Sequence, residues 1–175
     1  MPIAYDALPK TAANYVPLSP RSFLERTADI YGHRDAVIYN ERRYSWNEVR
    51  DRVRRAASAL NARGIGKNDT VSLLAYNTPE MFEAHHFVPL SGAVLNTINT
   101  RLDAGTVAYI IDHAETKVFI TDRELWPIVK QALTQSKGQP EIIIIDDISA
   151  VSQPDLPDDY TDYESFLAQG DSAYR

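Results

Sequence analysis

Hydrophobic and polar positions divide the chain into a regular series of short apolar runs and longer periodic segments. Four nearly continuous apolar runs predict buried strands, at 70–76, 93–98, 117–122 and 141–147. The segments between these runs carry apolar residues at the three- and four-residue spacing of a helix. Strands that alternate with helices in this way are typical of a parallel sheet that is covered on both faces.

Capping residues predict where the helices begin. Ser19 and Pro20 indicate an N-cap and a first helical position, for a helix that runs to about Tyr31. The letters SWNE (45–48) form a capping box for a helix that stops at Gly64. Thr78 is predicted to begin a helix that runs to about Gly92, and Asp103 one that runs to His113. Two further capping boxes predict helix starts: TDRE (121–124), for a helix to about Gln135, and TDYE (161–164), for a short last helix.

Apolar and polar positions alternate on both sides of an Asn40–Glu41 turn in residues 35–46, DAVIYNERRYSW. This pattern predicts a β-hairpin. We therefore predict an α/β fold: a mainly parallel sheet with helices on both faces, plus a short N-terminal β-hairpin. The expected organisation is a polar, extended leader (1–18), an α/β subdomain (19–150), and a polar connector with a short helix (151–175).

Composition narrows the class of protein. The 175 residues are enough for one domain with its own core, and the net charge of −6 argues against nucleic acid as a partner, because that affinity comes from Lys and Arg. No stretch approaches the ~18 apolar residues of a membrane span. Residues 1–10 do not resemble a signal peptide and the chain has no cysteine, so we expect a cytoplasmic protein without disulfides or thiolate metal sites.

The segment 50–63 is rich in arginine, with Arg50, Arg52, Arg54, Arg55 and Arg63. Its apolar residues recur at helical spacing, which places the arginines on a solvated face. The same spacing predicts two ion pairs within the helix, Glu48–Arg52 and Asp51–Arg55. We favour this solvated face over a functional basic patch.

Two adjacent histidines near two glutamates suggest a metal site, at Glu80, Glu83, His85 and His86. Neighbouring helical residues point about 100° apart, so the histidines cannot share one ligand face. His85 falls on the apolar stripe of its helix, where a buried, hydrogen-bonded imidazole or a pocket wall is expected. No second carboxylate–histidine set accompanies these residues in the sequence, so we assign no metal ligand.

Acidic residues end two predicted strands, at Asp122 and at Asp146–Asp147. The carboxyl ends of parallel strands are where open α/β sheets bind ligands, but acids also end strands and cap helices, so we favour a structural role and keep ligand binding as the alternative. The sequence has no nucleophile motif and no glycine-rich phosphate loop. It therefore assigns no catalytic, cofactor-binding or metal-ligating residue.

Several segments nevertheless resemble one family. Residues 83–122, EAHHFVPLSGAVLNTINTRLDAGTVAYIIDHAETKVFITD, closely resemble the acyl-CoA synthetases of the adenylate-forming superfamily, most of all the branch that activates fatty, methylmercaptopropionate-type and related carboxylic acids. RRYSWNEVRDRVRRAASAL (42–60) and GIGKNDTVSLLAYNTPEMFEAHH (64–86) resemble the family's helix entry and its next strand and helix. The resemblance runs from about Leu18 to Leu167. It implies the N-terminal subdomain of an AMP-forming ligase that makes acyl-CoA, AMP and pyrophosphate from a carboxylic acid, ATP and coenzyme A.

The chain departs from the family in what it lacks. The family's phosphate loop ending in Pro-Lys-Gly, its aromatic-Gly-x-Thr-Glu and Tyr-x-x-Gly-Asp motifs and its C-terminal-domain lysine are not in this sequence. In relatives the loop follows soon after a segment like YESFLAQGD (163–171). His86 also stands where relatives more often have an aromatic residue. We therefore expect an N-terminal fragment that is inactive alone and binds no cofactor, with ATP, magnesium and coenzyme A used by the full-length parent.

Two other hypotheses stay open from the sequence: a stand-alone binding or interaction module built on this subdomain, and an unrelated flavodoxin-type nucleotide-binding domain. A fragment would leave strand edges and apolar faces uncovered, so we expect it to self-associate or to be unstable as a monomer. The first surface expected for this is EIIIIDD (141–147), because little sequence follows to cover it, and the next is PLSGAVLNTI (89–98). Val94 and Leu95 are expected in a strand that is buried on both faces.

Overall fold

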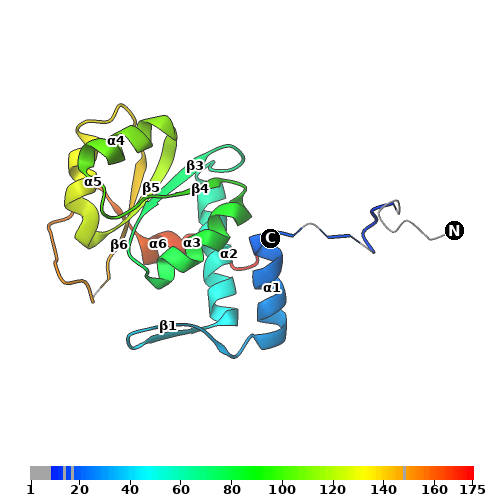
Figure 1. Cartoon of the computed structure of the whole chain (residues 1–175). Helices are drawn as coiled ribbons and strands as arrows, with labels where there is room; N and C mark the ends of the chain where they lie inside the picture. Colours follow the sequence, from blue (N-terminus) through cyan, green and yellow to red (C-terminus); the bar gives the residue numbers. More distant parts are fainter. Residues whose placement is uncertain (1–8, 14, 17, 148) are drawn as a thin grey trace.

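The structure is a computed structural model that describes residues 9–13, 15–16, 18–147 and 149–175 (Figure 1). Its helices are α1 (Pro20–Tyr31), α2 (Trp46–Ala62), α3 (Pro79–Ser91), α4 (Ala104–His113), η2 (Arg123–Leu125, a 3₁₀ turn), α5 (Trp126–Leu133) and α6 (Tyr163–Ala168). Its strands are β1 (Asp35–Tyr39), β2 (Arg42–Ser45), β3 (Thr70–Leu74), β4 (Val94–Thr97), β5 (Thr116–Asp122), β6 (Glu141–Ile145) and β7 (Thr161–Asp162). Within the described ranges no helix has both the length and the apolar character needed to cross a bilayer.

The predicted fold class is confirmed. Five strands form one sheet in the order β4-β3-β5-β6-β7, and every pairing in it is parallel. Strands β1 and β2 form a separate antiparallel hairpin, with Asn40 at a positive φ of 51° in its turn, as Asn tolerates. The predicted leader lies partly outside the described residues, and those of its residues that are described are exposed. The proposed division into 1–18, 19–150 and 151–175 stays a prediction.

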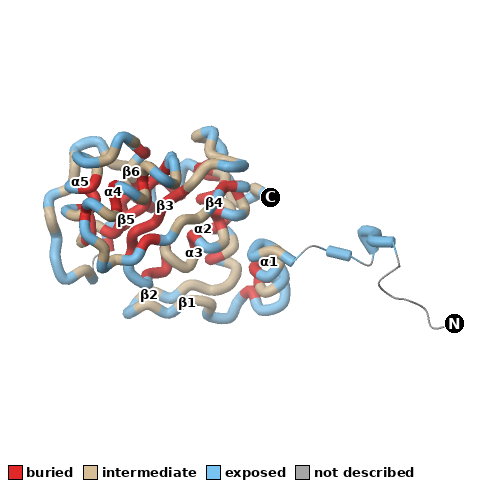
Figure 2. The backbone as a smooth tube through the Cα atoms, turned by 45° about the horizontal axis from the view of Figure 1, so that its top comes forward, coloured by how far each residue is buried: buried red, intermediate tan, exposed pale blue. Residues whose placement is uncertain are grey.

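Two helical layers cover the sheet, because alternate residues of the central strands point to opposite faces. In β6, Ile143 and Ile145 join a core with α1, α2, α3 and α6, whereas Ile144 joins a second core with α4 and α5. All three isoleucines are at most 2% exposed. Figure 2 shows the buried strands running through the middle of the molecule, between the two layers.

Most of the predicted helix boundaries are confirmed. Ser19 and Ser45 each form a reciprocal capping box, and Asp103 accepts a hydrogen bond from the N–H of Thr106. Gly64 and Gly92 follow the ends of α2 and α3 with φ angles of 77° and 89°, a conformation that glycine adopts without a steric cost.

Two predicted capping boxes are wrong. The hydroxyl of Thr121 donates to the carbonyl of Leu74 within the sheet, so η2 precedes a helix that begins only at Trp126. In the last helix the cap is Asp162, whose side chain accepts a hydrogen bond from the N–H of Ser165, so the helix begins one residue later than the predicted box requires. At Thr121 a contact within the sheet competes with the cap for the same short polar side chain.

The expectation that β4 is buried on both faces is also wrong. Strand β4 pairs with β3 and is the last strand at its side of the sheet. Val94 is 54% exposed, and Leu95 is only partly buried against the core. Edge strands have one neighbour, so a parallel pairing alone does not enclose them.

The reason given for self-association through residues 141–147 is wrong as well. The two residues of β7 pair with the outer edge of β6, and α6 packs on the same strand. The sequence after Asp147 therefore covers the isoleucines that were expected to be uncovered. Of the two surfaces considered, the β4 edge is the one that remains open among the described residues.

Candidate functional site

The carboxyl ends of β3, β5 and β6 lie at one edge of the sheet and border a pocket of about 330 Å³. This is the edge at which open α/β sheets bind ligands. The hairpin reaches the same edge and contributes Tyr39. The pocket is lined by Tyr39, Tyr76, Asp122, Arg123, Glu124, Asp147, Ser149, Ala150 and Val151.

Asp122 ends β5 and is only 3% exposed. Its Oδ2 accepts a hydrogen bond from the backbone N–H of Tyr76, whereas its Oδ1 is buried without a hydrogen-bond partner among the described residues. Burial raises the pKa of Asp122 to about 7, against the hydrogen bond from Tyr76, and the negative charges of Glu80 and Asp147 add to the rise. Asp122 therefore changes its charge near neutral pH.

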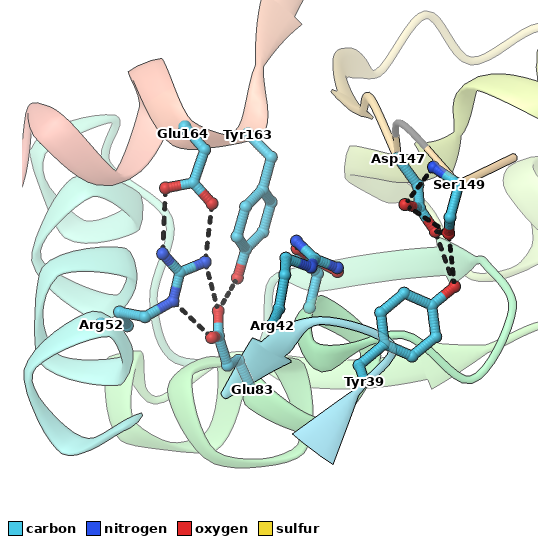
Figure 3. A network of polar contacts seen from close by, with 9 residues as sticks. Tyr39, Arg42, Arg52, Glu83, Asp147, Ser149, Tyr163 and Glu164 are labelled. Atoms are coloured by element: carbon cyan, nitrogen blue, oxygen red, sulfur yellow. Dashed lines mark hydrogen bonds and ion pairs between the residues drawn. The ribbon is translucent and has the colours of Figure 1, made fainter. Parts of the chain in front are cut away.

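Asp147 is the opposite case. Burial favours its neutral form, but hydrogen bonds from the hydroxyl of Tyr39 (2.6 Å) and from the N–H of Ser149 (2.9 Å) outweigh burial and lower the pKa of Asp147. The same bond to Asp147 raises the pKa of Tyr39. Figure 3 shows that this contact ties the hairpin to the loop after β6.

The structure brings together two of the three acids singled out in the sequence. Asp122 and Asp147 both border the pocket, whereas Asp146 turns away and pairs with Arg123 at 3.1 Å. Tyr39 was not singled out, because it lies 108 residues before its partner Asp147 and the hairpin gives no local sign of that contact. The lining residues can bind and orient a ligand, but they include no pair of nucleophile and histidine base for covalent catalysis.

A second polar network lies between α2, α3 and α6 (Figure 3), with Glu83 buried and Glu164 58% exposed. Arg52 contacts Glu83 through Nε at 2.5 Å, and it holds Glu164 with two hydrogen bonds of 2.7 and 2.9 Å. The hydroxyl of Tyr163 donates to Glu83 at 2.8 Å. Burial raises the pKa of Glu83 to about 7 in spite of the adjacent guanidinium. These contacts connect α2, α3 and α6.

The prediction of a solvated arginine face on α2 is therefore wrong. The side chains of four of these arginines are only 14–19% exposed, and they pair with other elements: Arg50 with Asp29, Arg52 with Glu83 and Glu164, Arg54 with Glu25, and Arg63 with Glu141. In the two ion pairs predicted within the helix, Glu48 and Arg55 contact other groups instead. Glu48 bonds with Ser45 at the helix start, and Arg55 donates to the carbonyl of Gly170.

The histidines do not form a metal site. His85 is exposed, with Nδ1 2.9 Å from the carbonyl oxygen of Met81, so the expectation of a buried imidazole is wrong and the alternative of a pocket wall holds. His86 is half-buried against Phe82, with ring centroids 5.1 Å apart, and burial lowers its pKa. The described part of the chain contains no group of three His, Cys, Asp or Glu placed to hold a metal ion.

Comparison of the sequence with known proteins gives one consistent result. The AMP-binding enzyme family matches residues 24–171. The chain is 42% identical over 171 residues to a peroxisomal butyrate–CoA ligase of Arabidopsis thaliana, a match that covers 95% of this chain and 30% of that protein. It is 40% identical over 179 residues to a peroxisomal acetate/butyrate–CoA ligase of the same plant, covering 97% and 32%. A peroxisomal trans-cinnamate:CoA ligase of Petunia hybrida is 39% identical, with the same coverage of 97% and 32%.

Solved structures agree at the level of the fold. A benzoate CoA ligase from Burkholderia xenovorans LB400 has a TM-score of 0.76 at 21% identity, over 89% of this chain and 29% of that one. An anthranilate CoA ligase in complex with anthranoyl-AMP has a TM-score of 0.81 at 18% identity, over 94% and 30%. The chain spans about a third of the length of the curated relatives that it matches. The family resemblance is thus confirmed and an unrelated flavodoxin-type domain is excluded: the chain belongs to the AMP-binding enzyme family.

Proposed function

We propose that the chain forms the N-terminal part of an AMP-forming ligase that joins a carboxylic acid to coenzyme A. The observation that carries this proposal is the 42% identity to a butyrate–CoA ligase across 95% of the chain. The other relatives are named for acetate or butyrate and for trans-cinnamate, so the proposed substrate class is a small aliphatic or aromatic carboxylic acid.

The pocket at the carboxyl ends of the strands does not favour ATP. It is bordered by the carboxylates of Asp122, Glu124 and Asp147, and the one guanidinium beside them, that of Arg123, is paired with Asp146, so the charge there would repel a triphosphate. A set of three side chains that could coordinate a metal ion is not found in the described ranges. We therefore propose that ATP, magnesium and coenzyme A are bound by other parts of the ligase, and that this chain supplies scaffold for them.

A split-enzyme experiment tests the proposal. The chain is produced alone and together with the portion of the Arabidopsis butyrate–CoA ligase that lies outside the matched segment, and butyrate-dependent exchange of pyrophosphate into ATP is measured. We expect no exchange from the chain alone and exchange from the pair. Exchange by the chain alone would contradict the assignment of ATP binding to other parts of the ligase.

The control for association is co-purification of the two parts. A stable complex without exchange would count against the ligase proposal and would favour the stand-alone binding module, since the scaffold would then be present without its activity. The cytoplasmic location expected from the sequence stays a prediction.

A further inference from the structure

Exposed apolar side chains gather on α1 and on the residues just before it. Six of the eleven large hydrophobic residues that are exposed in the described part of the chain lie within residues 15–31: Tyr15, Val16, Leu18, Phe23, Ile30 and Tyr31. The other five are scattered over β1, β4, α4 and two loops. Single exposed hydrophobic residues are normal on a protein surface, whereas a group of them marks a surface that contacts a partner.

Helix α1 has apolar residues on two faces. Leu24 and Ala28 point toward the body of the molecule and are each 3% exposed. Phe23 and Ile30 are 57% and 59% exposed, and their spacing of seven residues places them on one face, two turns apart. At about 100° per residue, this outer face points away from Leu24 and Ala28. A helix that is apolar on both sides is typical of the inside of a larger protein, and among the described residues nothing covers the outer face.

Both ends of the segment that matches the relatives lie at this helix. The match to the butyrate–CoA ligase covers 95% of the chain, so it takes in α1, the first helix of the described part. At the other end, Arg175 borders a pocket of about 380 Å³ together with Arg21 and Asp29 of α1 (Figure 1). The matched segment is 30% of that ligase, and the larger remainder of the ligase continues from one or both of these ends. The remainder is therefore joined to the matched segment beside α1.

We propose that the outer face of α1, formed by Phe23 and Ile30, is the surface on which the remainder of the ligase packs. The remainder presents apolar side chains there, because burying the two exposed residues against an apolar surface removes both surfaces from water. The inference rests on the proposed ligase function and deepens it, since it names the contact between this chain and the parts of the ligase that bind ATP and coenzyme A.

Thiol labelling tests the proposal, because the chain contains no cysteine and a single introduced thiol reports on one position. Phe23→Cys and Ile30→Cys probe the outer face of α1. Tyr109→Cys is the matched control, since Tyr109 is a 65% exposed aromatic residue of α4, on the opposite face of the sheet. Each variant is prepared in the 175-residue chain and in a chimaera in which the chain replaces the matched segment of the Arabidopsis butyrate–CoA ligase. The rate of reaction with N-ethylmaleimide is read from the mass of the peptide that carries the thiol.

We expect the three thiols to react at similar rates in the chain alone, because all three positions are exposed. In the chimaera, labelling at positions 23 and 30 should slow by about tenfold or more, and labelling at position 109 should stay within about twofold. Equal slowing at all three positions, or no slowing at positions 23 and 30, would overturn the proposal. Slow labelling of position 23 in the chain alone would overturn it as well: a rate that falls with chain concentration would assign the face to a second copy, and a rate that is slow at every concentration would assign it to the leader.

Formation of butyryl-CoA by the same chimaera is measured separately, so that the two proposals can fail independently. Protection of positions 23 and 30 without butyryl-CoA formation would count against the ligase function and would still support the packing surface. Butyryl-CoA formation by a chimaera in which both positions react freely would overturn the packing surface and leave the ligase function in place.

Discussion

Replacing Arg52 with methionine should lower the free energy of unfolding by about 3–5 kcal/mol, because it leaves the carboxylate of Glu83 buried without its cation. Methionine keeps most of the aliphatic stem, so the change removes charge more than packing. The side chain of Glu83 is 1% exposed, and among the described residues only the hydroxyl of Tyr163 would remain as its partner. The structure therefore predicts a large loss in the free energy of unfolding for this substitution.

The loss should also depend on pH, in a direction that follows from Glu83. Its pKa in the folded chain is about 7, above the value of an unfolded glutamate, so stability falls as the pH rises through this range. Removing Arg52 takes away an attraction that favours the charged form and raises the pKa of Glu83 further. The difference between wild type and variant should thus be small near about pH 5 and should grow as the pH rises above about 7.

Urea unfolding at the two pH values measures this difference, with two further variants as controls. Glu164→Gln removes only the charge of a partner of Arg52 that is 58% exposed, so it should lower the free energy of unfolding by less than about 1 kcal/mol. Glu83→Gln combined with Arg52→Met removes the buried charge and should recover part of the loss. A loss below about 1 kcal/mol for Arg52→Met at the higher pH would refute the reasoning.

Three other predictions follow from the fold. Leu73→Ala in the enclosed strand β3 should lower the free energy of unfolding, measured in urea melts, by about 2–5 kcal/mol. Leu95→Ala at the sheet edge should lower it clearly less, and equal losses of free energy would contradict the strand order. Because the pKa of Asp122 is raised from 3.8 to about 7, stability should fall as the pH rises from about 4 to about 7. Asp122→Asn should flatten that fall in melting temperature, and an unchanged pH profile would count against a buried charge at Asp122. We expect the chain to self-associate through the open edge of β4. Sedimentation equilibrium should then show a dimer that Val94→Lys disrupts, and a wild-type chain that stays monomeric at high concentration would contradict this prediction.

Helix starts could be predicted because a cap is a contact between residues three or four apart. Ser45 and Glu48 satisfy each other in the structure as their spacing indicates. The same pattern failed at Thr121, because the carbonyl that takes its hydroxyl belongs to Leu74, 47 residues earlier. Local pattern therefore fixes an element only where no distant group competes for the same side chain.

Strand order and the polar site could be predicted only in part, because both depend on contacts between residues that are far apart in the sequence. The apolar runs predicted four of the five strands of the sheet, but the two residues of β7 are too few to show a period, and nothing local places β4 at the edge. At the site, strand ends pointed to Asp122 and Asp147, whereas the contact with Tyr39 depends on how the hairpin packs. Arg52 was expected on a solvated helix face because its partners, Glu83 and Glu164, lie 31 and 112 residues away in the sequence.

The central claim is that these residues form the N-terminal part of a ligase that joins a carboxylic acid to coenzyme A. The most direct measurement is the rate of butyryl-CoA formation by a chimaera in which residues 24–171 replace the matched segment of the Arabidopsis butyrate–CoA ligase. The account predicts ATP-dependent formation of butyryl-CoA well above that of the same ligase without the segment. A soluble, cooperatively folded chimaera that forms no butyryl-CoA would contradict it.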